Sequence, residues 1–271
     1  MLGHCSRNLQ LHYIIKVQTM NVFRTPSGTD FTPLQDRKIY VLWIALITVI
    51  TIAGFLPDIA RYRAEVPPPP FILHFHGFTY SLWLILVGLQ IALIEVKKPR
   101  IHMQLGWWLV GLSVALVPIG LIAAMVDMAR QVAHSDYEPQ FLGLEFQSML
   151  VLALLIGAGT LLRSDLAAHK RLMVLAAINL LDPGASRLFT LFSPWKPGGI
   201  FGWWLKYFWA NALMVLALIA WDLWKRRKVH PALLWGGALL AAGELVAVWL
   251  EFAPWWRPIS ARLVTLWAWP G

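Results

Sequence analysis

The sequence predicts an all-α integral membrane protein, a bundle of seven transmembrane helices with the N-terminus in the cytoplasm and the C-terminus outside. Three observations lead to this prediction. Of the 271 residues, 58% are hydrophobic and 14% are charged, whereas an average soluble domain is nearer ~45–50% apolar and ~25% charged. Seven long apolar runs follow one another, and a membrane helix needs roughly 20 such residues. The segments between the runs alternate in their basic charge.

The seven runs are residues 39–56, 71–95, 105–126, 141–162, 172–192, 201–224 and 232–250. Strands of a membrane barrel would alternate in polarity, but these runs are continuously apolar. Backbone groups in lipid must be hydrogen-bonded within their own segment, so each run is predicted to be a helix. The fifth run is interrupted by Asp182-Pro183-Gly184, where proline removes a backbone donor and glycine loosens the helix.

The runs divide the chain into three parts. Residues 1–38 form an N-terminal cytoplasmic segment for which little structure is expected. This segment carries charges and lacks a long apolar core, so no cleavable signal peptide is expected. Residues 39–252 form the transmembrane domain. Residues 253–271 form a Trp-rich tail, expected along the outer interface because Trp favours the headgroup region.

The basic residues predict the orientation of the helices. Segment 1–38 and the loops after the second, fourth and sixth runs hold 15 of the 23 Lys and Arg. The other eight lie on the opposite side, so the positive-inside rule places the N-terminus in the cytoplasm. The net charge of +9 is therefore attributed to orientation, with no nucleic acid as partner. A lone cysteine, Cys5, excludes an intramolecular disulfide and a Cys-based metal site.

Histidines at helix starts form the first candidate site. His102, His169 and His230 lie at the cytoplasmic starts of the third, fifth and seventh helices, and His76 lies near the outer start of the second. The positive end of the helix dipole disfavours imidazolium, and neutral imidazole is the form that ligates metals or haem iron. If their helices are neighbours, two of the first three are predicted to hold a haem b or a metal. The alternatives are interfacial capping and proton transfer.

His76 shares a helical face with Tyr80, Trp83 and Gln90, at spacings of four, seven and fourteen residues. This stripe is predicted to face the interior of the bundle. The alternative is an interior packing stripe whose polar groups are satisfied.

Polar residues within the apolar runs form the second candidate site. Each ionisable group costs roughly 2.5–3.5 kcal/mol near the bilayer centre, so such groups normally face the interior and pair. Asp182 lies beside the helix break, an arrangement that resembles ion and proton sites of transporters. The alternative is a structural kink in which Asp182 bonds freed backbone groups or pairs with a basic residue. The predicted buried polar set is Asp182, Asn179, Asn211, Glu244, Glu145, Arg187 and Lys206.

Several motifs occur in order between about residues 71 and 256: His76-Gly77 followed by Trp83 and Gln90, His102 to Trp107, Ala168 to Met173 with Arg187, and Val229-His230-Pro231. This order resembles an uncharacterised family of bacterial polytopic inner-membrane proteins. Its members usually carry an arginine after the first-loop histidine, whereas Met103 follows His102 here. The resemblance implies a bacterial inner membrane and an importance of the four histidines, and it implies no reaction.

The leading functional prediction is a histidine-ligated, b-type-haem-like electron-transfer protein. One alternative is a proton- or ion-coupled transporter that uses Asp182 and Glu244. Another is an accessory or assembly subunit of a larger membrane complex. No catalytic residue is predicted, since the sequence has no P-loop, GxSxG, HExxH or GxGxxG opening a strand–helix unit. The expected partners are the lipid bilayer and other membrane subunits.

Overall fold

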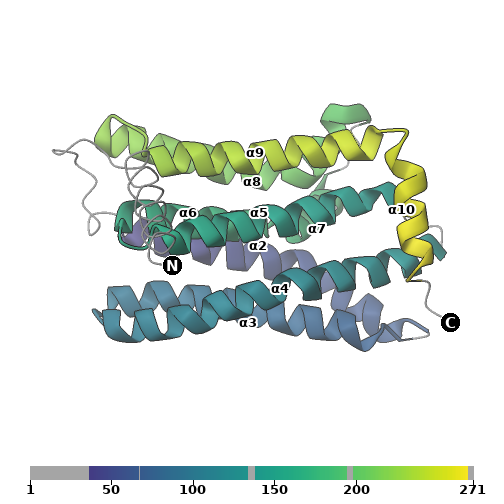
Figure 1. The fold of residues 1–271 in the computed structure, drawn as a ribbon, viewed down its shortest axis with the longest axis horizontal. Coiled ribbons are helices and arrows are strands. Elements are labelled where there is room, and N and C mark those ends of the chain that lie inside the picture. Colours follow the sequence, from purple (N-terminus) through teal and green to yellow (C-terminus); the bar gives the residue numbers. More distant parts are fainter. Residues whose placement is uncertain (1–36, 67, 134–137, 194–197, 268–271) are drawn as a thin grey trace, which may run out of the picture.

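The computed structural model describes residues 37–66, 68–133, 138–193 and 198–267. Within these ranges the chain is helical and has no strand, which confirms the all-α prediction. Most helices run along one long axis (Figure 1). The elements in order are α2 (Arg37–Ala64), α3 (Phe71–Glu95), α4 (Pro99–Ala133), η1 (Pro139–Phe141), α5 (Leu142–Leu161), α6 (Leu166–Asn179), α7 (Asp182–Phe192), α8 (Gly199–Arg226), α9 (Pro231–Phe252) and α10 (Trp256–Thr265).

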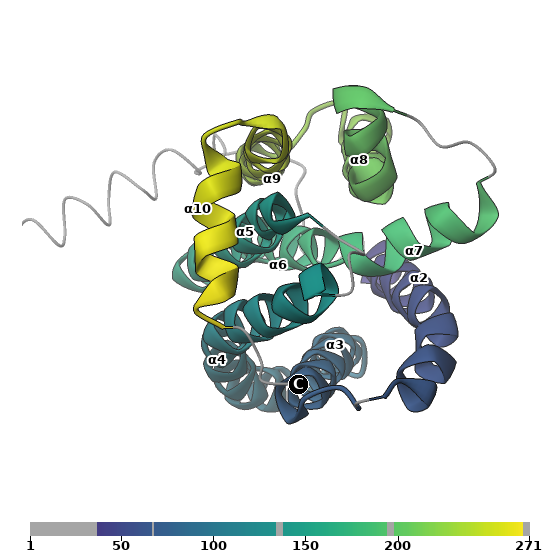
Figure 2. The ribbon, with the colours of Figure 1, turned by 90° about the vertical axis from the view of Figure 1, so that its right-hand side faces the viewer.

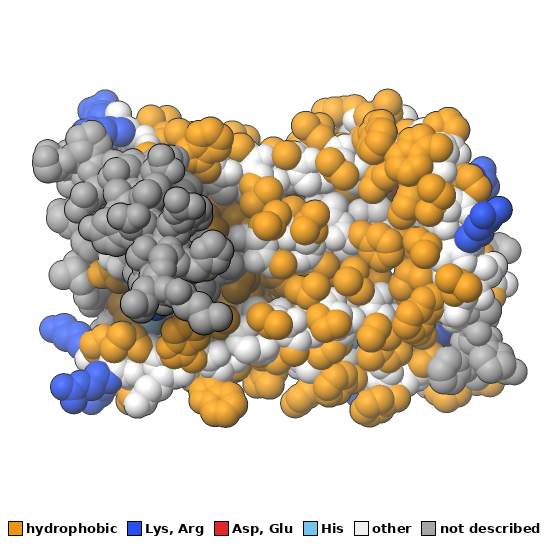
Figure 3. All heavy atoms as spheres, viewed as in Figure 1, with side chains coloured by type: hydrophobic (Ala, Val, Ile, Leu, Met, Phe, Trp, Pro, Cys, Tyr) orange, Lys and Arg blue, Asp and Glu red, His pale blue; other side chains and the backbone are white. Residues whose placement is uncertain are grey.

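The length and surface of the helices indicate a multi-pass membrane protein. Six helices are long and apolar enough to cross a bilayer, and in one of them α5 is counted together with η1. The helices α6 and α7 meet at a bend of 47° and give a seventh span if they cross together. Outside the grey residues, Figure 3 shows hydrophobic side chains spread over this face, with Lys and Arg at the two ends. The described chain therefore has six to seven candidate spans.

Helix α4 is longer than the apolar run 105–126 that predicts it. Its 35 residues span about 52 Å at 1.5 Å per residue, whereas the hydrocarbon core of a bilayer is about 30 Å thick. Both ends of α4 therefore reach beyond the core. The sequence understated this helix because its first and last turns carry polar residues.

Helix α6 lies inside the bundle. It packs against α2, α5, α8 and α9, and ten of its 14 residues are buried. The consecutive helices α3, α4, α5 and α6 also pack on one another in order (Figure 2). The starts of α4, α6 and α9 lie at the same end of the bundle, which we call the histidine end. The opposite end is called the α10 end.

The predicted interruption of the fifth run is present as a break between α6 and α7. Leu180 and Leu181 form a turn there, and Pro183 lies in the first turn of α7, where its missing N–H is tolerated. At this break α7 packs closely on α2. A Cβ atom on Gly184 would lie 2.8 Å from the Cα atom of Thr51, and one on Gly54 would collide with the Gly184 carbonyl. Only glycine permits this approach.

Helix α10 crosses the bundle at the end for which it is named (Figures 1 and 2). It buries Trp256, Ser260 and Val264, which share one face because they are four residues apart. The Trp256 indole donates to the Gln140 carbonyl at 2.9 Å. The N-terminal segment up to residue 36 and the last residues of the tail lie outside the described residues.

Candidate functional site

Two of the predicted histidines lie together at the histidine end. His102 is in the first turn of α4, and His169 is in the first turn of α6. Their ring centroids are 6.4 Å apart and their planes are nearly perpendicular, at 85°. Helix α5 packs against both α4 and α6, and this packing brings the two helix starts to one level.

Backbone carbonyls fix the orientation of both imidazole rings. The Nδ1 atom of His102 lies 3.1 Å from the Gln90 carbonyl, and that of His169 lies 2.8 Å from the Gly159 carbonyl. A carbonyl oxygen only accepts, so each Nδ1 carries the hydrogen and each neutral ring keeps its lone pair on Nε2. Such a carbonyl partner on the far nitrogen is the usual arrangement around a metal-ligating histidine.

His230 has a different role. It is the N-cap of α9, and its Nδ1 atom accepts a hydrogen bond from the Ala232 backbone N–H at 3.1 Å. Burial, helped by the positive charge of Arg171, lowers the pKa of His230 to about 4. The ring is therefore neutral and its Nδ1 lone pair is used by the cap. Of the alternatives foreseen for these histidines, capping is the one that His230 fulfils.

His76 lies in the part of α3 near the α10 end, at the opposite end of the bundle from His102 and His169. Its ring stacks on Tyr80 with centroids 6.3 Å apart, as their shared helical face leads one to expect. The Tyr80 hydroxyl donates to the Leu180 carbonyl at the α6–α7 break. Within the described part of the chain, no three His, Cys, Asp or Glu residues lie close enough to hold a metal ion.

A buried ion-pair network stabilises the histidine end. Asp222 of α8 accepts hydrogen bonds from Arg171 at 2.6 Å and 3.1 Å, and from Arg226 at 3.1 Å. The backbone N–H of His230 also donates to Asp222, at 3.2 Å. All three charged side chains are at most 2% exposed. The sequence reasoning missed Asp222, although its i, i+4 spacing to Arg226 was an available signal.

The second cluster lies at the α6–α7 break. Asp182 is 1% exposed, Asn211 of α8 is 1% exposed and Glu244 of α9 is 4% exposed. Glu244 accepts hydrogen bonds from Asn211 Nδ2 at 3.3 Å and from Trp204 Nε1 at 3.2 Å. The same Asn211 amide also contacts Asp182. An amide side chain thus connects two carboxylates inside the bundle.

The remaining residues of the predicted polar set make other contacts. Asn179 is buried and donates to the Ser148 carbonyl at 2.8 Å. Glu145 lies in the first turn of α5 and is partly exposed. The Lys206 amine lies over the Tyr207 ring, 4.9 Å from its centroid. Neither Lys206 nor Arg187 pairs with Asp182 within the described residues, and its oxygens accept no hydrogen bond there. The expected kink is present, but the bonding of Asp182 to backbone groups or to a basic residue is wrong.

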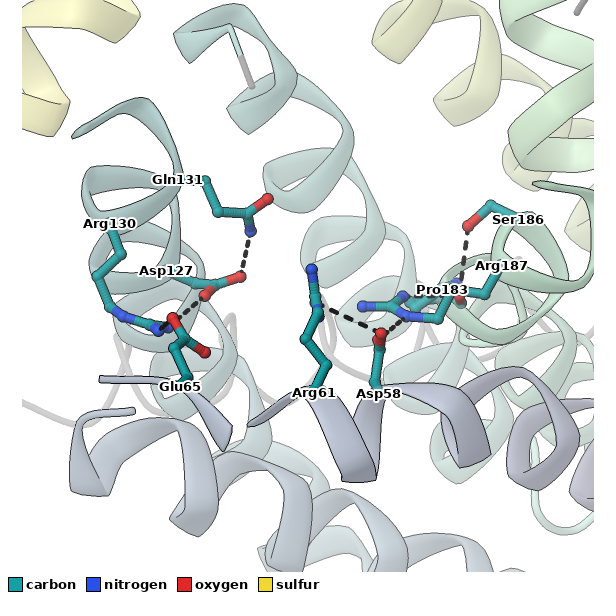
Figure 4. A network of polar contacts seen from close by, with 9 residues as sticks. All are labelled: Asp58, Arg61, Glu65, Asp127, Arg130, Gln131, Pro183, Ser186 and Arg187. Carbon is teal, nitrogen blue, oxygen red and sulfur yellow. Dashed lines mark hydrogen bonds and ion pairs between the residues drawn. The ribbon is translucent and has the colours of Figure 1, made fainter. Parts of the chain in front are cut away.

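Arg187 belongs instead to a charged network near the α10 end, which joins α2, α4 and α7 (Figure 4). It donates to Asp58 of α2 and, through Nη1 at 2.7 Å, to the Pro183 carbonyl. Arg130 of α4 pairs with both Glu65 and Asp127. The sequence reasoning did not single out these three carboxylates, because charges near the ends of apolar runs are also typical of solvated loops.

The fold and these sites define the class: a polytopic all-α membrane protein with a histidine pair at one end and two linked carboxylates at a broken helix. Comparison of the chain with family models, with curated proteins and with solved structures finds no match.

Proposed function

We propose that this protein transfers electrons in the membrane and holds a b-type haem between His102 and His169. The observation that carries the proposal is the geometry of this pair. The ring centroids are 6.4 Å apart, and both rings are fixed in the tautomer that leaves Nε2 as a ligand. The Nε2 atoms of His102 and His169 would hold the haem iron, which would supply one-electron redox chemistry at this end of the bundle.

A haem suits two imidazoles better than a free metal ion does. Structural zinc takes about four protein ligands, and the described residues offer no cluster of three. Haem iron receives four ligands from the porphyrin and needs only one or two from the protein. The Arg163 guanidinium, 5.3 Å from the Trp107 ring centroid, lies close in sequence to His169. Such a group binds carboxylates, including those of haem propionates.

The test is an optical spectrum of protein purified from cells supplied with haem. A Soret band is expected in the unaltered protein and should be lost in a His102→Ala, His169→Ala double variant. His74→Ala is the matched control, because His74 is an exposed histidine of α3. A folded, colourless preparation of the unaltered protein would refute the haem proposal.

We also propose that the histidine end faces the cytoplasm of a bacterial inner membrane, with the N-terminus inside and the C-terminus outside. The support is the excess of Lys and Arg in the segments at that end, together with the positive-inside rule. A reporter that is active only in the cytoplasm should work when fused after Lys228 and fail when fused after Gly271. Activity of both fusions would exclude seven spans.

Proton- or ion-coupled transport is a second candidate function, favoured by the broken helix beside two buried carboxylates. Discontinuous helices of this kind form the ion sites of many transporters. In liposomes, proton-coupled flux should be lost in Asp182→Asn and retained in the double histidine variant. The reverse pattern would exclude transport through Asp182. Electron transfer would require membrane partners, and copurification of a stoichiometric subunit with no haem would favour an accessory subunit instead.

A further inference from the structure

The carboxylate of Asp182 is buried without a donor. Neither of its two oxygens accepts a hydrogen bond from any described residue, although the residue is 1% exposed. Buried polar groups in native structures are almost always paired, and an unpaired ionised carboxylate in an apolar interior is especially costly. As an ionised carboxylate, Asp182 thus has no compensating partner among the described residues.

Asn211 supplies a second, independent observation. Its Nδ2 donates to Glu244, while its Oδ1 receives no hydrogen bond from the described residues. The Asn211 side chain contacts Asp182. The acceptor oxygen of Asn211 and both oxygens of Asp182 thus lack a donor among the described residues. One proton on Asp182 would turn this carboxylate into a donor and satisfy both groups.

Acidic rather than basic groups surround Asp182. Glu244 on α9 and Glu145 on α5 are the acidic groups in electrostatic contact with it, and Tyr80 on α3 is nearby. The basic residue on its own helix, Arg187, is paired with Asp58 of α2. No described cation compensates Asp182, and Glu244 is the carboxylate that holds two protein donors.

We propose that Asp182 carries an exchangeable proton, donated to Asn211 Oδ1, while Asn211 Nδ2 donates to the ionised Glu244. The three side chains then form one hydrogen-bonded chain, in which every atom now unpaired on Asn211 has a partner. Release of the proton converts the carboxylic acid to carboxylate plus H⁺ and leaves the chain broken at Asp182. The proposal is independent of the histidine pair. It deepens the candidate transport function, on which it rests because both involve the carboxylates Asp182 and Glu244.

The first test is infrared spectroscopy of the full chain in lipid nanodiscs. The carbonyl stretch of a protonated carboxylic acid should appear at neutral pH and disappear in Asp182→Asn. This variant is expected to fold, because its amide can still donate to Asn211 Oδ1. Absence of a band that depends on Asp182 overturns the proposal, whatever the transport assay shows.

The second test is labelling with a hydrophobic carbodiimide, which reacts with protonated carboxyl groups, followed by mass spectrometry. Asp222 is the matched control, since it is as deeply buried but pairs with two arginines. Asp182 should be labelled about tenfold more than Asp222, because pairing with cations holds a carboxylate in its charged form. Equal labelling contradicts the proposal. If sodium at constant pH protects Asp182 from labelling, the site binds a sodium ion and the proton proposal is overturned.

Discussion

The buried ion-pair network at Asp222 permits a quantitative prediction. Asp222→Asn preserves the size of the side chain and removes its charge. Arg171 and Arg226 are 1% and 2% exposed at their side chains, so both guanidinium groups would stay buried with their shared counter-charge gone. Removal of one partner from a buried ion pair typically costs about 3–5 kcal/mol. Because two cations share this carboxylate, we expect a loss near the upper end of that range.

An exposed ion pair on the same protein provides the control. Arg257 and Glu138 lie 2.7 Å apart, and their side chains are 64% and 58% exposed. Exposed pairs contribute about 0–1 kcal/mol, so Glu138→Gln should leave the free energy of unfolding almost unchanged. The assay is reversible unfolding in mixed micelles, monitored by circular dichroism, with the two variants measured in parallel.

A triple variant separates charge from packing. Replacing Arg171, Asp222 and Arg226 together with Met, Leu and Leu removes every buried charge of the network. Apolar replacement of a whole buried ion network is often neutral or stabilising, so this variant should recover much of the stability that Asp222→Asn loses. The reasoning is refuted if Asp222→Asn costs no more than Glu138→Gln.

Two further predictions concern the helix crossing and the cap. Gly54→Ala should destabilise the fold by about 1–3 kcal/mol through overpacking, because its new Cβ would meet the backbone of Gly184. Gly77→Ala faces open space and should stabilise α3 by up to about 1 kcal/mol, since alanine favours a helix over glycine. Unfolding titrations of the two variants test this. The pKa of His230 is lowered to about 4 in the folded state from the ordinary 6.5. As pH falls, the unfolded chain therefore takes up the His230 proton at a higher pH than the folded chain does. Stability should fall by up to about 1.4 kcal/mol per pH unit as pH drops from 6.5 to 4. His230→Asn keeps an N-cap acceptor and should remove that part of the pH dependence; an unchanged profile would contradict the assigned pKa.

The sequence was sufficient for the long helices because a long apolar run is a strong signal that needs no tertiary information. It also located the break, since Pro183 cannot donate the backbone hydrogen bond of a continuous helix. It did not predict α10, which lies in the segment expected only as a Trp-rich tail. It was less accurate at the helix ends. Helix α4 begins at Pro99 and ends at Ala133, well beyond the predicted run, because polar residues continue a helix once it leaves the apolar core.

For the histidines, the sequence predicted at which end of the bundle each one lies, but it could not predict which of them contact one another. Alternating topology places His102, His169 and His230 at one end, as the structure has them. Which of them meet depends on the order of helices around α5, and that order follows from side-chain packing across the whole bundle. The capping geometry of His230 likewise depends on the loop before Pro231, where the chain turns back beside Asp222.

The α6–α7 break links the carboxylate cluster to the charged network of Figure 4. Arg187 lies one turn beyond Pro183, donates to its carbonyl and pairs with Asp58 of α2. The glycine contact between α2 and α7 lies within the same few turns. These contacts hold α7 against α2 at the place where Asp182 begins the helix. A change in the protonation of Asp182 therefore takes place where α7 begins, next to the contacts that join α7 to α2.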